Sequence, residues 1–163
     1  MPLTSLWIFF PLAISLHNLE EAIWLPGWSK YAGKFHQPVE ANEFYFAVIC
    51  VTVLAYLATF LAVAFPTEGP WKYIFYGFLG TMILNAFLSH FAATVALRRY
   101  SPGLLTGLFL LVPINTIILY QAVVASDIQW PALLLSTIAV SVILLSLLPL
   151  FFRVGRKLTE QLA

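Results

Sequence analysis

The chain has 163 residues, of which 61% are hydrophobic and only 9% are charged. In a soluble domain about a quarter of the residues are charged, so most of this surface must face lipid. The formal net charge of +1 and the lack of a basic tract argue against a nucleic-acid partner, and the single cysteine, Cys50, excludes an intramolecular disulfide.

Five segments are apolar and long enough to cross a hydrocarbon core of about 30 Å at about 1.5 Å per residue. No positive charge precedes the first of them, so we expect it to be a mature span and not a cleaved signal peptide. Pro26-Gly27 is predicted to end this first helix. The sequence therefore predicts an all-α membrane protein, a single domain over residues 1–163 with five transmembrane helices: Leu3–Leu25, Asn42–Phe65, Trp71–Leu97, Pro102–Ser126 and Trp130–Phe152.

The distribution of lysine and arginine predicts the orientation of these spans. If the N-terminus is outside, only Lys72 of the eight lysines and arginines lies outside, and the others fall on the cytoplasmic side. The positive-inside rule therefore predicts an outside N-terminus and a cytoplasmic C-terminus. We expect a multi-pass protein of the cell (inner) membrane in contact with membrane lipid, and its oligomeric state stays open.

The first predicted span carries the polar stretch His17-Asn18-Leu19-Glu20-Glu21 in apolar surroundings. At about 100° per residue, His17, Glu20 and Glu21 share one helix face. A charged side chain near the bilayer centre costs about 2.5 to 3.5 kcal/mol, and such groups normally face the bundle interior. No lysine or arginine lies deep in any span, so the candidate partners are a metal ion, a protonated histidine, a lysine of the next loop, or protons on the carboxylates.

The third span contains a second histidine at the same predicted depth. His17 precedes Leu25, and His90 precedes Arg98, by the same number of residues, so each lies about 12 Å from the cytoplasmic end of its span. Two imidazoles and one carboxylate form a ligand set that zinc uses in hydrolases, with a fourth position for water. We predict that His17, His90 and either Glu20 or Glu21 bind a divalent metal, with zinc preferred over iron or manganese. The other glutamate would act as a general base or as a hydrogen-bond partner that orients a histidine.

Other polar residues are expected to touch a substrate or to orient the ligands: Asn18, Asn85, Ser89, Tyr100 and Thr106. The string Tyr100-Ser101-Pro102-Gly103 is typical of a tight turn with an interfacial tyrosine. In the alternative interpretation, Tyr100 lines the mouth of the site. His36 lies in a predicted loop, where it is either solvated or a fourth ligand carried over the site.

The HXXEE string at residues 17–21, a further histidine and the Y-x-P-G string at residues 100–103 resemble the HXXEE family of small bacterial and archaeal membrane proteins. The two motifs occur in the family's order, and the resemblance covers most of the chain. We assign the family's additional histidine to His90, because it precedes the Y-x-P-G string on the span that leads into it. The family has no established activity, so the resemblance implies a shared site without naming a reaction.

The preferred hypothesis is a membrane-embedded, metal-dependent hydrolase that acts on a lipid or another hydrophobic substrate at a cytoplasm-facing His/Glu site. Three alternatives stay open: a metal-free acid-base isomerase on an apolar substrate, a small transporter, and a structural or binding subunit. In the structural alternative, the polar cluster only joins the first and third spans. Chelator-insensitive turnover would favour the isomerase, and polar residues that continue through the outer half of the bundle would favour the transporter.

Overall fold

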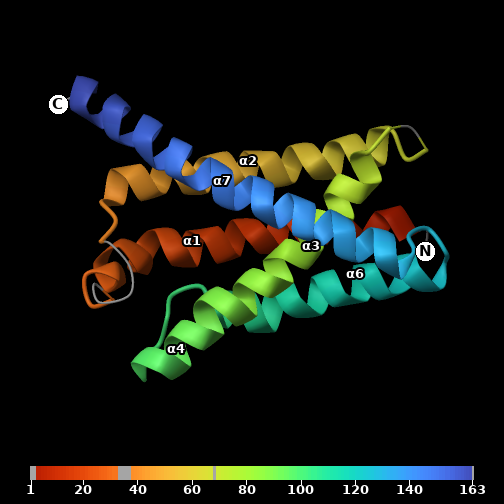
Figure 1. The fold of residues 1–163 in the computed structure, drawn as a ribbon, viewed down its shortest axis with the longest axis horizontal. Helices are drawn as coiled ribbons and strands as arrows, with labels where there is room; N and C mark the ends of the chain where they lie inside the picture. Colours follow the sequence, from red (N-terminus) through yellow and green to blue (C-terminus); the bar gives the residue numbers. More distant parts are fainter. Residues whose placement is uncertain (1–2, 33–37, 68, 163) are drawn as a thin grey trace.

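The computed structural model describes residues 3–32, 38–67 and 69–162, and every regular element in that part of the chain is a helix (Figure 1). The elements are the 3₁₀ helix η1 (Leu3–Leu6), α1 (Phe9–Ser29), α2 (Ala41–Ala64), α3 (Trp71–Asn85), the π-helix η2 (Ala86–Phe91), α4 (Ala92–Leu97), α5 (Leu104–Thr106), the π-helix η3 (Gly107–Leu111), α6 (Val112–Val124) and α7 (Trp130–Leu162). Since α3, η2 and α4 follow one another without a break, as do α5, η3 and α6, the described chain forms five rods that run back and forth.

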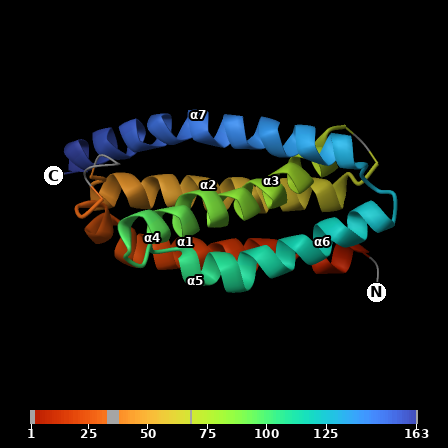
Figure 2. The same cartoon turned by 60° about the horizontal axis from the view of Figure 1, so that its bottom comes forward.

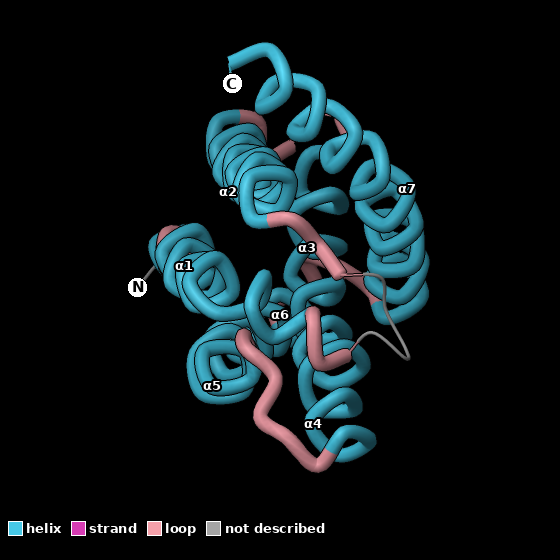
Figure 3. Tube along the Cα trace, turned by 90° about the vertical axis from the view of Figure 1, so that its left-hand side faces the viewer, coloured by secondary structure: helices cyan, strands magenta, loops and turns pink. Residues whose placement is uncertain are grey.

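The α3 rod occupies the centre of the bundle. It packs against α2, α6 and α7, with α7 on one side and α1 and α6 on the other (Figures 2 and 3). Two glycines permit the close contact with α7: a Cβ on Gly77 would lie 2.5 Å from the Ser136 backbone oxygen, and one on Gly80 would collide with the Thr137 side chain. Small residues let helices approach closely in this way inside membranes.

Four of the rods are long and apolar enough to cross a membrane, which identifies the chain as a membrane protein with transmembrane helices. They are Ala41–Ala64, Trp71–Leu97, Leu104–Val124 and Trp130–Gln161, and they correspond to the second to fifth predicted spans. The first rod, α1, is not among them, because its polar residues between positions 17 and 21 lower its mean hydropathy. Length and composition therefore support four of the five predicted spans.

The end of α1 differs from the prediction. The helix continues through Pro26 to Ser29, so the expected stop at Pro26-Gly27 is wrong. A proline removes the hydrogen bond that would reach the carbonyl of Ala22, but only three residues of α1 follow Pro26, so little of the helix depends on that bond. The Ser29 hydroxyl also donates to the Pro26 carbonyl oxygen at 2.8 Å, which satisfies one acceptor of that turn.

The end of α7 differs as well. The helix continues past the predicted end at Phe152 to Leu162, because arginine and lysine favour helix as strongly as many apolar residues do. The prediction followed the end of the apolar run, which is not the end of the helix. Arg156 holds this extension against α2, since its Nε and Nη2 atoms donate to the Glu43 carboxylate at 2.6 and 3.1 Å.

Candidate metal centre

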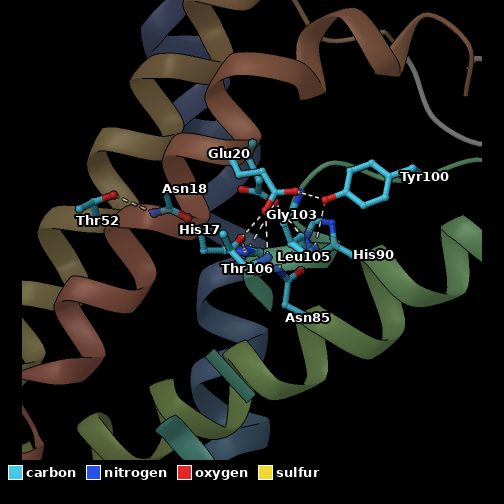
Figure 4. Close-up of polar contacts among 11 residues, drawn as sticks. His17, Asn18, Glu20, Thr52, Asn85, His90, Tyr100, Gly103, Leu105 and Thr106 are labelled. Atoms are coloured by element: carbon cyan, nitrogen blue, oxygen red, sulfur yellow. Dashed lines mark hydrogen bonds and ion pairs between the residues drawn. The ribbon is translucent and has the colours of Figure 1, made fainter. Parts of the chain in front are cut away.

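Two histidines and one glutamate form a cluster where α1 meets η2. Figure 4 labels the two histidines, His17 and His90. One ligand atom of each residue, His17, Glu21 and His90, lies within 4.8 Å of the other two. Glu21 Oε1 is 3.0 Å from His90 Nε2 and 3.7 Å from His17 Nε2, and the two imidazole rings lie 5.1 Å apart at 82°. The histidines are only 1% and 3% exposed, so the cluster is inside the bundle.

Two different helix geometries bring these side chains together. His17 and Glu21 lie one turn apart on the same face of α1, as their spacing of four residues predicts. His90 lies on η2, where the backbone hydrogen bonds of a π-helix join residues five apart. Asn85 and His90 therefore share a face, with Asn85 Nδ2 3.1 Å from His90 Nε2, whereas in an α-helix they would point about 140° apart.

The second π-helix, η3, lies at the same level of the neighbouring rod. It ends at Leu111, two residues before Pro113, which cannot donate the hydrogen bond that an α-helical turn would require, so the turn before it widens. Gly107 begins η3, and a Cβ there would lie 3.2 Å from Ala86 Cβ and 3.6 Å from His17 Cε1. A small residue at this position therefore lets α1, η2 and η3 meet around His17.

His17 carries a nitrogen that needs a partner. Its Nε2 is buried and has no hydrogen-bond partner among the described residues. Leaving a buried polar atom unpaired costs about 1 to 3 kcal/mol, and Glu21 Oε1 at 3.7 Å is too distant for a hydrogen bond. Two imidazole nitrogens and a carboxylate oxygen are ordinary zinc ligands, so His17, Glu21 and His90 can hold a metal ion.

Glu20 belongs to a separate hydrogen-bond network. Its carboxylate accepts from the Gly103 N–H at 2.8 Å, the Thr106 N–H at 3.0 Å, the Thr106 hydroxyl at 2.5 Å and the Tyr100 hydroxyl. These donors join α1 to the turn between α4 and α5 (Figure 4). The two carboxylates that were interchangeable in the sequence thus differ in their contacts: Glu21 meets the histidines, and Glu20 meets the turn.

The Tyr100–Gly103 string forms a tight turn and also contacts the site. Gly103 has φ +94°, a conformation that favours glycine, and a Cβ on it would lie 2.6 Å from His90 Cε1. The Tyr100 hydroxyl accepts the Leu105 N–H at 3.1 Å, and its burial together with the hydrogen bond to Glu20 raises the pKa of Tyr100 to about 12. The sequence placed Gly103 only in a turn. No pattern in the sequence indicated that Gly103 lies against His90.

Of the other residues predicted to touch a substrate or to orient the ligands, some contact the histidines and others do not. Thr106 Oγ1 lies 3.1 Å from His17 Nδ1, so Thr106 and Asn85 each contact one of the histidines. Asn18 instead donates to Thr52 Oγ1 on α2 at 2.7 Å, and Ser89 is exposed, with no hydrogen bond from its hydroxyl to any described residue. His36 lies outside the described residues.

Comparison with known proteins agrees with the motifs. A family described as "Protein of unknown function with HXXEE motif" matches residues 7–118, which contain the cluster and the Tyr100–Gly103 turn. A curated relative, the uncharacterised protein YrkK of Bacillus subtilis (strain 168), is 51% identical over 151 residues, which cover 93% of this chain and 96% of the relative. No solved structure matches the chain significantly. The resemblance seen in the sequence is confirmed: this chain belongs to the HXXEE family.

Proposed function

We propose that the cluster is a zinc centre held by His17 Nε2, His90 Nε2 and a Glu21 oxygen. The observation that carries this proposal is the buried His17 Nε2, which has no hydrogen-bond partner among the described residues and lies beside a second imidazole and a carboxylate. Three protein ligands with a fourth position left for water are the arrangement of catalytic zinc sites, whereas structural sites have four protein ligands.

Charge supports a metal over a purely structural cluster. Within the described part of the chain, the ion pairs of lysine and arginine are Lys72 with Asp127 and Arg156 with Glu43, and neither involves the carboxylates of α1. The Glu21 side chain is only 14% exposed, and a largely buried carboxylate without a cation is costly in a low-dielectric environment. A divalent ion at the cluster supplies the missing positive charge.

The membrane arrangement in this proposal includes α1 as a fifth span, with the N-terminus outside and the C-terminus in the cytoplasm. In α1 the polar residues His17 and Glu20 are buried, whereas many of its large apolar residues face outward. The exposed apolar residues of this rod include Leu12, Leu16, Leu19 and Ile23. A helix that is polar inside the bundle and apolar outside is suited to lipid surroundings. The positive-inside rule supports the orientation, in the cell (inner) membrane.

The proposed reaction is hydrolysis of a lipid or another hydrophobic substrate. A bound zinc ion lowers the pKa of its water ligand to about 7 and polarises a carbonyl or phosphoryl oxygen. The protein residues hold and orient the ion, and the surrounding helices give an amphiphilic substrate access from the bilayer. No lysine or arginine competes for the Glu21 carboxylate in the described chain, so it stays available as a ligand.

Metal content tests this proposal directly. The full-length protein is purified in detergent, and zinc is counted by elemental analysis for the wild type, His17→Ala, His90→Ala and Glu21→Gln. We expect about one zinc per chain in the wild type and near none in the three variants. Asp127→Asn, which alters a carboxylate outside the cluster, serves as the matched control and should retain the metal. Metal retained by both histidine variants would contradict the ligand assignment, and His36→Ala tests whether the third histidine takes part.

A metal-free acid-base enzyme is the second candidate, because Glu21 Oε1 already lies 3.0 Å from His90 Nε2. Such a pair can move a proton on a bound apolar substrate without a cofactor. Turnover of lipid esters in vesicles, measured before and after removal of metal with a chelator, separates the two reactions. Loss of turnover on chelation, with recovery on adding zinc, supports the hydrolase, whereas unchanged turnover supports the metal-free enzyme.

A further inference from the structure

The geometry points to Glu20 and Thr106 as positioning residues that fix which nitrogen of His17 is free to bind a metal. This inference rests on the proposed zinc centre and adds the roles of two residues that do not touch the ion. It also assigns Glu21 as the ligand and Glu20 as the residue that positions His17. Two contacts carry it: the Thr106 hydroxyl meets Glu20 on one side and His17 on the other.

Glu20 acts as an acceptor in every contact it makes. Two of its donors are backbone N–H groups, of Gly103 and Thr106, and a backbone N–H can only donate. The Tyr100 hydroxyl likewise donates its one hydrogen to Glu20, while its oxygen accepts the Leu105 N–H. The fourth contact of the Glu20 carboxylate is with the Thr106 hydroxyl, and the carboxylate accepts there as well.

The hydrogen bond from Thr106 to Glu20 determines the role of Thr106 in its contact with His17. A hydroxyl has one hydrogen, and at 2.5 Å from Glu20 Oε2 the hydrogen of Thr106 is donated to the carboxylate. The Thr106 oxygen therefore accepts in its other contact, with His17 Nδ1 at 3.1 Å. The hydrogen of the neutral His17 imidazole must then lie on Nδ1, which leaves the lone pair on Nε2.

The nitrogen selected by this chain is the one that the cluster needs. Nε2 is the buried atom without a hydrogen-bond partner, and it faces Glu21 and His90. Metal-binding histidines normally donate their second N–H to a fixed acceptor, and loss of that acceptor lowers metal affinity about 10- to 100-fold. Glu20 therefore acts on the ion from a distance, through a hydroxyl and an imidazole, while Glu21 binds it.

Substitution of Thr106 tests this assignment. Thr106→Val keeps the volume and the backbone N–H to Glu20 but removes the hydroxyl, and Thr106→Ser restores the hydroxyl without the methyl group. Thr52→Val is the matched control, because it removes the same group from the residue that bonds Asn18, the neighbour of His17. Zinc affinity of the metal-stripped, full-length protein is measured by competition with a chromophoric chelator. We expect Thr106→Val to bind zinc about 10- to 100-fold more weakly, and Thr106→Ser and Thr52→Val to match the wild type.

The outcomes separate this inference from the proposed function. If the wild type binds no zinc, the zinc centre itself is wrong. If the wild type binds zinc and Thr106→Val binds it equally well, the zinc centre stands and the positioning role is overturned. Equal weakening in Thr106→Ser and Thr106→Val overturns it too, since the methyl group and not the hydroxyl would then matter. Thermal unfolding without metal identifies a folding defect in Thr106→Val, and Thr106→Ala then takes its place in the same titration.

Discussion

Two clusters of ionisable side chains in this protein differ in whether their charges are matched. Where α3 begins and α6 ends, at one end of the bundle (Figure 1), Lys72 Nζ lies 3.2 Å from Asp127 Oδ1 and the Tyr76 hydroxyl donates to Asp127 Oδ2 at 2.6 Å. Cation, anion and hydroxyl satisfy one another there. The cluster of His17, Glu21 and His90 instead has a carboxylate with no lysine or arginine partner in the described chain, and a buried nitrogen without a hydrogen bond.

We interpret this difference as the difference between a structural contact and the proposed metal site. A matched cluster holds helices together and needs no ligand. An unmatched cluster inside a bundle is stabilised when a cation arrives, because metal binding contributes directly to the stability of the folded state. Substitutions in and around the two clusters should therefore have different effects on stability and on metal affinity.

Removal of Glu20 should have the largest effect. Glu20→Ala leaves four donors without their acceptor, and at about 1 kcal/mol for each we expect the free energy of unfolding to fall by about 4 kcal/mol. Denaturant unfolding in detergent micelles measures the loss. Glu20→Gln keeps the volume and one carbonyl acceptor and should lose less. A loss below about 1 kcal/mol for Glu20→Ala would show that the turn is held by other contacts.

Gly103→Ala should be nearly as damaging. The left-handed backbone costs an L-residue about 1 to 2 kcal/mol, and the new methyl group would meet the His90 ring, so we expect a total loss of about 3 kcal/mol. Zinc binding should weaken as His90 is displaced. Gly27→Ala is the matched control, because a Cβ there meets no atom within 4 Å and alanine favours the helix. Equal stability of the two variants would contradict the close contact at Gly103.

Zinc should stabilise only proteins with an intact histidine cluster. At a free zinc concentration 100 times the dissociation constant, binding adds about 2.7 kcal/mol to the free energy of unfolding. We expect this gain in the wild type and in Asp127→Asn, and none in Glu21→Gln. The thermal midpoint with and without zinc checks the prediction. A gain in Glu21→Gln equal to that of the wild type would remove Glu21 from the ligand set.

Tyr76→Phe should affect stability without affecting zinc. The variant loses one hydrogen bond to a charged acceptor, Asp127, which is worth about 1.5 kcal/mol. Zinc affinity should equal that of the wild type, because the contacts of Tyr76 and Lys72 with Asp127 do not involve the histidine cluster. A change in zinc affinity larger than the experimental error would show that the two clusters are coupled through α3.

Tyr100 should show the smallest effect, confined to high pH. Burial and the hydrogen bond to Glu20 raise its pKa from 10.0 to about 12. Because the folded-state pKa lies above the unfolded value, the contribution of the phenol to stability is complete below about pH 10 and is lost as pH rises from about 10 to about 12. The difference in phenolate absorbance between the wild type and Tyr100→Phe measures this titration. A difference signal centred near pH 10 would contradict the hydrogen bond from Tyr100 to Glu20.

Much of the helical frame is predictable from the sequence, because long apolar runs leave no other structure in a membrane. The spacing of four residues between His17 and Glu21 also predicts their shared face. Residue spacing alone fails to predict two features of the helices. A proline near a helix end does not stop α1 at Pro26, and helical periodicity of 3.6 residues does not reveal the wider turn that pairs Asn85 with His90.

The division of roles between the two glutamates could not be predicted from α1 alone. Glu20 and Glu21 are adjacent, and both fall on the polar face, so spacing treats them alike. Their difference comes from the turn after α4 and from α5, which are distant in the sequence and supply two donors each to Glu20. The position of Gly103 against His90 depends on the same tertiary contact.

The length of α7 has a practical consequence for topology. At about 1.5 Å per residue its 33 residues span about 50 Å, which exceeds a hydrocarbon core of about 30 Å. The surplus carries exposed Arg153, Lys157 and Glu160, so a cysteine introduced at Glu160 into a Cys50→Ala background would stand in water. A membrane-impermeant thiol reagent would then label it from one face of sealed vesicles only, so α7 provides a built-in reporter of which side of the membrane the chain ends on.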